Sequence, residues 1–127
     1  MSQVVLDSSA ILALLHLEPG SDRVLALTPH AIVSSVNASE VQACQVRDGG
    51  DPKRSWDNLS AVVRAIVPFD AAQAEIAGSL IRQTAPYGLS LGDRACLALA
   101  LKTGCEVYTA DRAWSQLQVG VPIHLVR

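Results

Sequence analysis

The chain has 127 residues, of which 50% are hydrophobic and 4% aromatic, and its formal net charge is −2 with a pI of about 5.8. This length fits a single domain over residues 1–127, with enough apolar material for one core. A protein that binds nucleic acid through charge alone is usually far more basic, so this composition excludes that class. Any nucleic-acid function must depend on a local site, with metal ions supplying positive charge.

Nothing in the sequence indicates export or a membrane. Met1-Ser2-Gln3 lacks the basic start of a signal peptide, and the apolar run from Ala10 to Leu15 is much shorter than the roughly 20 residues that span a bilayer. Cys44, Cys96 and Cys105 are widely spaced and form no CxxC pair. We expect them to be buried small hydrophobes in a reducing, cytoplasmic protein, and we expect no His/Cys metal site.

Short apolar runs alternate with longer helical patterns, which predicts α/β architecture with a parallel sheet of about five short strands flanked by helices. The strands are expected at residues 3–6, 31–33, 66–69, 105–109 and 122–126. Pro68 favours an edge position for the third strand. Helices are expected at residues 7–17, 21–27, 36–47, 53–65, 70–85 and 91–102, with a helical turn at 111–114. In the helix over 70–85, the inward residues are expected to be Ile76, Ala77, Leu80 and Ile81.

Two aspartates follow strands of the predicted sheet. Asp7 comes directly after the first strand, and Asp111 comes two residues after the fourth. Because the carboxyl ends of parallel strands share one edge, where ligands bind, we expect both side chains at that edge. The alternative for each is a helix cap, which is a common role for aspartate between a strand and a helix.

Glu40 lies inside the helix predicted over residues 36–47. Three of the four residues on its stripe are apolar, which predicts that the carboxylate points along the inward side of the helix. Those neighbours are Val36, Ala43, Cys44 and Arg47. Burying an unpaired charge is costly, so such a placement favours a function. The alternative is a salt bridge to Arg47 at the helix edge.

Asp93 lies in the first turn of the helix predicted over residues 91–102. Ser90-Leu91-Gly92-Asp93 has the S-x-x-D form of a capping box, which is a structural role. Asp93 also shares a stripe with Cys96, Leu97 and Ala100, which directs it toward the protein. Gly92 leaves room for a substrate or a metal ion to approach. Both roles remain open, and they are compatible.

Together, the four carboxylates predict a divalent-metal site. Mg²⁺ and Mn²⁺ take oxygen ligands, and converging carboxylates repel one another strongly without cations. A metal-activated water held by such a cluster can attack a phosphodiester while the metal stabilises the developing charge. The sequence has no evident Ser-His-Asp or Cys-His arrangement. It also has no P-loop, because Gly49-Gly50 lacks a neighbouring Lys-Ser/Thr pair.

A resemblance to a known family covers essentially the whole chain. It rests on four segments, Val5-Leu6-Asp7-Ser8-Ser9-Ala10, Glu40-Val41, Leu89-Ser90-Leu91-Gly92-Asp93 and Thr109-Ala110-Asp111-Arg112. In their order and spacing these segments resemble a PIN-domain ribonuclease. Within that family, the chain resembles the VapC-type toxin of a VapBC toxin–antitoxin pair.

The resemblance implies a Rossmann-like PIN domain and endoribonuclease activity that depends on Mg²⁺ or Mn²⁺. It also implies an RNA substrate, a homodimer, and a cognate antitoxin whose C-terminal segment covers the active site. By position it makes catalytic and metal-site residues of Asp7, Glu40, Asp93 and Asp111, of which Asp7 and Asp93 hold metal directly. It implies that Ser8 or Ser9, and Thr109, steady these carboxylates through hydrogen bonds.

Two further groups of residues could serve partners. Arginines near the acidic residues could hold phosphates, although a solvated or salt-bridged surface position is the ordinary alternative; they are Arg47, Arg94 and Arg112. Apolar residues in the first half predict an exposed surface for a dimer or an antitoxin helix. They are Leu12, Leu15, Leu17, Leu25, Leu27 and Trp56, and the alternative is that the leucines pack in the core.

Three other classes of protein share parts of this pattern. A phosphoacceptor receiver domain needs an Asp after a middle strand and a Lys after a later one, but Pro68-Phe69-Asp70 matches poorly and Asp111 is not that Lys. A haloacid-type phosphatase normally has a second Asp two residues after the first, where this chain has Ser9. A non-enzymatic α/β interaction module would keep the fold without needing all four acids.

Overall fold

The computed structural model describes residues 2–127, so Met1 lies outside the described residues. Its centre is a parallel sheet of five strands in the order β3-β2-β1-β4-β5. The strands are β1 (Val4–Leu6), β2 (Ala31–Ser34), β3 (Ala65–Val67), β4 (Glu106–Thr109) and β5 (Ile123–Leu125). The predicted α/β class is confirmed, and β3 is an edge strand as Pro68 indicated.

Helices connect the strands and cover both faces of the sheet. The α-helices are α1 (Ser8–Leu15), α2 (Ser21–Leu27), α3 (Ser35–Arg47), α4 (Pro52–Val62), α5 (Ala71–Ser79), α6 (Ile81–Thr84) and α7 (Leu91–Thr103). Three short 3-10 helices are η1 (Thr28–His30), η2 (Ala85–Tyr87) and η3 (Arg112–Gln116). None of the helices in residues 2–127 has both the length and the apolar character needed to cross a membrane.

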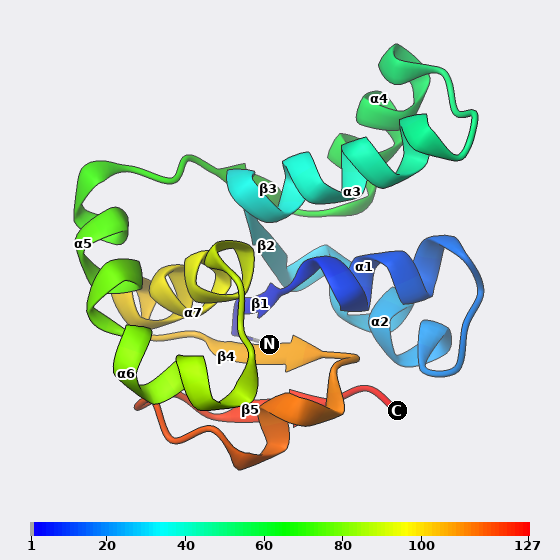
Figure 1. Cartoon of the computed structure of the whole chain (residues 1–127). Coiled ribbons are helices and arrows are strands. Elements are labelled where there is room, and N and C mark those ends of the chain that lie inside the picture. Colours follow the sequence, from blue (N-terminus) through cyan, green and yellow to red (C-terminus); the bar gives the residue numbers. More distant parts are fainter. Residues whose placement is uncertain (1) are drawn as a thin grey trace.

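The hydrophobic core consists of two clusters, one on each face of the sheet. Val4 and Leu6 pack toward α1 to α4, whereas Val5 faces α7 with Cys96. This alternation follows from the strand geometry, because successive side chains point to opposite faces. In Figure 1, α5 to α7 accordingly lie on one side of the sheet, with α1 and α2 on the other. All three residues of β1 are buried, as expected for a central parallel strand.

Three predicted helices are shorter than expected, and the first of them, predicted over 7–17, spans Ser8–Leu15. The helix predicted over 53–65 ends at Val62, because Val63 is extended and the N–H of Arg64 donates to the carbonyl oxygen of Ala31. Sheet pairing here overrides the helix propensity of Ala65. The helix predicted over 70–85 divides at Leu80 into α5 and α6. The break changes the direction of the next turn, so Ile81 is exposed rather than inward.

Candidate metal centre

Asp7 lies at the carboxyl end of β1, where it is almost completely buried. Its carboxylate accepts hydrogen bonds from three donors. The Ser9 hydroxyl donates to its Oδ1 at 2.8 Å, the Thr109 hydroxyl donates to its Oδ2 at 2.6 Å, and the backbone N–H of Ala10 donates to Oδ1 at 2.9 Å. Thr109 ends β4, the neighbouring parallel strand, so the sheet itself brings these side chains together.

Burial raises the pKa of Asp7 from 3.8 to about 6, against the opposing effect of the hydrogen bonds from Thr109, Ala10 and Ser9. The negative charge of Asp93 raises the pKa further. The hydrogen bonds fix the orientation of the carboxylate but do not fully replace the water lost on burial. Asp7 is therefore an oriented carboxylate whose charged form is only partly compensated, a state that a cation would relieve.

Ser9, rather than Ser8, is the serine that supports Asp7. Its hydroxyl also accepts a hydrogen bond from the backbone N–H of Ala110 at 3.0 Å and lies 3.2 Å from the Thr109 hydroxyl oxygen. No hydrogen bond of the Ser8 side chain is found within residues 2–127. The arrangement links the ends of β1 and β4 through Ser9 and Thr109, the role expected of residues that orient a ligand.

Glu40 lies where α3 approaches the start of α7. The Asn37 amide nitrogen donates to Glu40 Oε1 at 2.9 Å and to the carbonyl oxygen of Gly92 at 3.0 Å. Asn37 is fully buried, and it was not among the residues predicted for the site. The only signal was its position one helical turn before Glu40. Glu40 itself is exposed, so it is not buried as its stripe suggested, although its carboxylate faces α7 beside Gly92. The alternative salt bridge is also not seen, because Arg47 pairs with Asp48.

Asp93 is half-buried at the first turn of α7 and forms the capping box with Ser90. One Asp93 oxygen accepts from the Ser90 N–H at 2.9 Å. The effect of Asp93 on the buried thiol of Cys96 shows that it lies close to the other acidic residues. Burial, together with the charges of Asp7, Asp93 and Glu40, raises the pKa of that thiol well above its ordinary value. The charges of three carboxylates from separate parts of the chain therefore all act on the Cys96 thiol.

Asp111 is connected to this group less directly. Its backbone N–H donates to the Thr109 hydroxyl oxygen at 3.0 Å, and the same hydroxyl donates to Asp7. Its own carboxylate is exposed and accepts from the N–H of Ala113, which caps η3. The structure thus places Asp111 at the predicted edge of the sheet without bringing its carboxylate into contact with the other three.

The capping alternatives considered for these aspartates are also correct, since Asp7, Asp93 and Asp111 all cap helices. Burial distinguishes Asp7 from an ordinary cap. Asp51 and Asp70 cap α4 and α5 with the same geometry, but both are exposed. The Lys102 ammonium that donates to Asp70 lowers the pKa of that carboxyl. A cap does not require the burial that Asp7 has, which favours a second role.

The donor set fits a hard divalent cation. It consists of carboxylate oxygens, the ligands that Mg²⁺ and Mn²⁺ prefer. None of the ion pairs within residues 2–127 involves Asp7, Glu40 or Asp93. In the same part of the chain, no three of these carboxylates have oxygens within 4.8 Å of one another. An open arrangement of this kind suits Mg²⁺, which usually keeps several of its waters.

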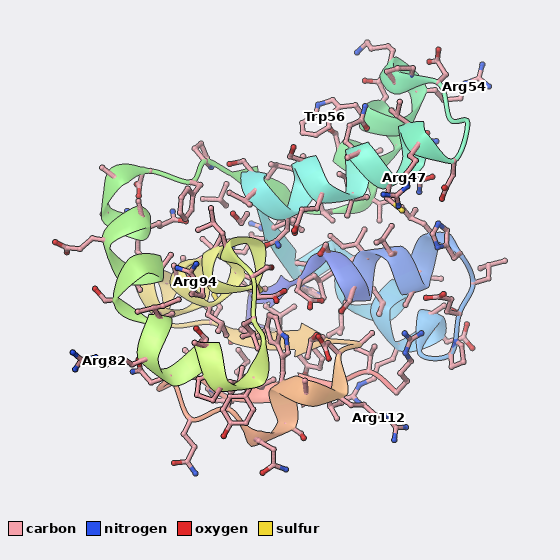
Figure 2. The ribbon with its side chains drawn as sticks, in the orientation of Figure 1. Arg47, Arg54, Trp56, Arg82, Arg94 and Arg112 are labelled. Atoms are coloured by element: carbon pink, nitrogen blue, oxygen red, sulfur yellow. The ribbon has the colours of Figure 1, made fainter. Side chains whose placement is uncertain are left out.

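The three arginines near the acidic residues have different environments, which Figure 2 shows. Arg94 donates to the carbonyl oxygen of Ala77 at 3.1 Å, which ties α7 to α5. Arg47 lies at the end of α3 with a loose, exposed pairing to Asp48. Arg112 is exposed at the start of η3, next to Asp111. Of the three, Arg112 is best placed to meet a phosphate at the carboxyl edge of the sheet.

The protein is of the α/β class, with several acidic residues at the carboxyl edge of its parallel sheet. The sequence profile of the PIN domain matches residues 4–120, so the chain belongs to the PIN domain family. This match confirms the resemblance found in the sequence. A comparison with curated proteins finds no match.

Solved structures share the fold over nearly the full length. The chain resembles a toxin–antitoxin complex from Klebsiella pneumoniae, with a TM-score of 0.78, 19% identity and 98% of each chain covered. It also resembles DNA-bound VapBC from Salmonella typhimurium, with a TM-score of 0.74, 18% identity and 100% of each chain covered. A third similar structure is VapC20 of Mycobacterium tuberculosis, described as a sarcin–ricin loop cleaving toxin. Its TM-score is 0.68, with 21% identity and 94% of this chain and 100% of that chain covered.

Proposed function

We propose that this protein is an endoribonuclease that depends on Mg²⁺ or Mn²⁺. The observation that carries the proposal is the placement of Asp7. It is buried at the carboxyl edge of the sheet, shares its surroundings with Asp93 and Glu40, and has no cationic partner among residues 2–127. Membership of the PIN domain family supports nuclease chemistry at this edge.

In this proposal Asp7 and Asp93 hold the metal directly, and Glu40 and Asp111 act through water or a second ion. A bound divalent cation offsets the charge of the phosphodiester and makes a nearby water more acidic. Ser9 and Thr109 keep the Asp7 carboxylate in one orientation. Asn37 does the same for Glu40. In the reaction, the water oxygen bonds to phosphorus, the bond from phosphorus to a ribose oxygen breaks, and that oxygen takes up a proton.

We propose further that the protein is the toxin of a VapBC-type pair and acts in the cytoplasm. The support is the similarity of fold to a toxin–antitoxin complex, to VapBC and to a toxin that cleaves the sarcin–ricin loop. Its partners would be an RNA substrate, a cognate antitoxin and a second copy of the chain. A short neighbouring reading frame for a DNA-binding protein would support this assignment, and mapping the 5′ ends of RNA fragments after induced expression would identify the target.

The test is RNA cleavage by the purified protein with Mn²⁺, with Mg²⁺ and with a chelator. We expect metal-dependent cleavage that Asp93→Asn abolishes. Asp51→Asn is the matched control, because Asp51 is the exposed cap of α4 and Asn caps equally well. If cleavage persists in the chelator or in Asp93→Asn, the proposal is wrong. A folded protein that binds a partner but cleaves no RNA would favour the non-enzymatic interaction module.

A further inference from the structure

A second group of metal-binding side chains lies away from the sheet edge, where the ends of α1 and α3 meet. Ligand atoms of His16, Cys44 and Asp48 all lie within 4.8 Å of one another. His16 is the residue that ends α1, and Cys44 and Asp48 lie one turn apart at the end of α3. The three residues are scattered in the sequence. No His/Cys site was therefore expected from the sequence, and the packing of α1 against α3 brings them together.

The backbone holds these three positions firmly. The N–H of His16 donates to the carbonyl oxygen of Leu12 at 2.9 Å, and the N–H of Asp48 donates to that of Cys44 at 3.1 Å. The side chains at Cys44 and Asp48 lie on the same face of α3 because they are four residues apart. Their Sγ and Oδ2 atoms are 3.8 Å apart. His16 and Asp48 are both exposed, so their side chains have room to adjust around an ion.

The electrostatic setting favours a cation. α1 and α3 both end here, and a helix C-terminus carries partial negative charge. A positive charge already lies here, since Arg47 Nη2 donates to Cys44 Sγ at 3.4 Å and its Nε lies 4.0 Å from Asp48 Oδ1. In Figure 2, Arg47 lies on the side of α3 that faces α1. The Arg47 side chain is 74% exposed, so it can turn into solvent when an ion takes its place.

The donor set differs in chemistry from the acidic centre. Sulfur, imidazole nitrogen and carboxylate oxygen together suit Zn²⁺, at about 2.3 Å for sulfur and about 2.0 Å for nitrogen and oxygen, whereas Mg²⁺ takes oxygen alone. Three protein ligands leave the fourth tetrahedral position for water. The group is also separate from Asp7, since His16 follows it by nine residues along α1, or about 13 Å at the helical rise.

We propose that His16, Cys44 and Asp48 form a Zn²⁺ site that joins the C-terminal ends of α1 and α3. The Cys44 thiol loses its proton to solvent when the ion binds, and water completes the coordination. The site is distinct from the acidic centre, and its occupancy does not depend on RNA cleavage.

The experiment uses the full chain after chelation, titrated with Co²⁺ as a spectroscopic probe and then with Zn²⁺. We expect one equivalent of Co²⁺ to produce a thiolate-to-metal charge-transfer band, which Zn²⁺ removes and excess Mg²⁺ does not. Cys44→Ser and His16→Ala should abolish the band. Cys105→Ser, which changes another half-buried cysteine, and Asp93→Asn at the acidic centre should retain it. Absence of the band in the unmodified protein, or its survival in Cys44→Ser, overturns the proposal.

A second measurement needs no variant, in case Cys44→Ser or His16→Ala fails to fold. The alkylation rate of Cys44 in the unmodified protein is followed by peptide mass mapping. Zn²⁺ at ten times its Kd should slow this rate about tenfold, because reaction requires the metal-free fraction. Mg²⁺ at the same concentration should leave it unchanged. Equal rates with and without Zn²⁺ would overturn the proposal.

Discussion

The carboxylate of Glu40 occupies the space beside Gly92 that a side chain at that position would need. A β-carbon added to Gly92 would lie 2.6 Å from Glu40 Cδ and from its Oε1, which is much closer than atoms normally approach. Asn37 holds the two residues together through hydrogen bonds to Glu40 and to the Gly92 carbonyl. The absence of a side chain at Gly92 therefore determines where Glu40 can lie at the acidic centre.

Gly92→Ala should leave the protein folded but weaken cleavage. The atoms that the new methyl group meets belong to the end of a flexible side chain, so the Glu40 carboxylate moves rather than the backbone. Displacing a group of this kind typically reduces activity or metal affinity roughly ten- to hundredfold. Gly78→Ala in α5 is the control, since nothing lies within 4 Å of a β-carbon there. Equal cleavage rates in the two variants would show that the position of Glu40 is unimportant.

The stability of the metal-free protein should depend on the titration of Asp7. Its folded pKa of about 6 exceeds its ordinary value of 3.8, so between these values the folded state binds more protons than the unfolded state. The free energy of unfolding should therefore fall as the pH rises from about 4 to 6 and then stay level. The fall should be roughly 3 kcal/mol, because the pKa of Asp7 differs by about two units between the folded and unfolded states. Urea unfolding in a chelator at several pH values measures this change.

Asp7→Asn should flatten that pH dependence and raise the stability of the metal-free protein above pH 6. The substitution removes the buried charge while keeping an oxygen that can accept from Ala10 and Ser9. Cleavage should be lost at the same time. A variant that simply unfolds would show instead that Asp7 serves mainly as the cap of α1.

Binding of Mg²⁺ or Mn²⁺ should raise the melting temperature, and the increase should diminish below about pH 6. The ion binds the charged form of Asp7, which becomes protonated as the pH falls through its raised pKa. At a metal concentration of one hundred times Kd the stabilisation is about 2.7 kcal/mol. Differential scanning calorimetry with EDTA and with Mn²⁺ checks this on either side of that pH. Superimposable melting curves would argue against a site at the acidic centre.

The parts of the site that depend on strand ends could be predicted from the sequence. Asp7 and Asp111 follow predicted strands, and a parallel sheet places such positions at one edge. Asn37 could not be predicted, because its role arises from the approach of α3 to α7, which involves residues 55 positions apart. The same limit explains the cluster of His16 with Cys44, which also depends on how two helices pack.

Helix boundaries and surface exposure were less predictable. The division at Leu80 follows Gly78 and Ser79, a pair at which helices often kink, but we predicted the break only at Pro86. Leu27 was expected on an apolar surface but lies in the core, and Leu12 and Leu15 are partly buried against the same core. Leucines at helical spacing look the same in a sequence whether the sheet or a partner protein covers the helix.

The remaining exposed leucines lead to a prediction about assembly. Leu17 is 82% exposed and Leu25 is 58% exposed, while Trp56 is exposed on α4. Leu17 also has a φ of 53°, in the left-handed region that disfavours residues with a β-carbon. Its side chain thus contributes little to the folded monomer, and its backbone conformation is strained. Both features are consistent with a residue retained for contact with a second copy or a partner.

Leu17→Gly should therefore weaken a homodimer without harming the monomer. Glycine is common just after a helix end and adopts the left-handed conformation without strain. The free energy of unfolding of the monomer should therefore rise by about 1 kcal/mol. Light scattering should report about twice the 13.4 kDa chain mass for the unmodified protein and a shift toward 13.4 kDa for the variant. Ile81→Ser is the control, because Ile81 is 47% exposed on α6, on the opposite side of the sheet. A monomer at every concentration, or a dimer that Leu17→Gly leaves intact, would show that α1 and α2 do not form the interface.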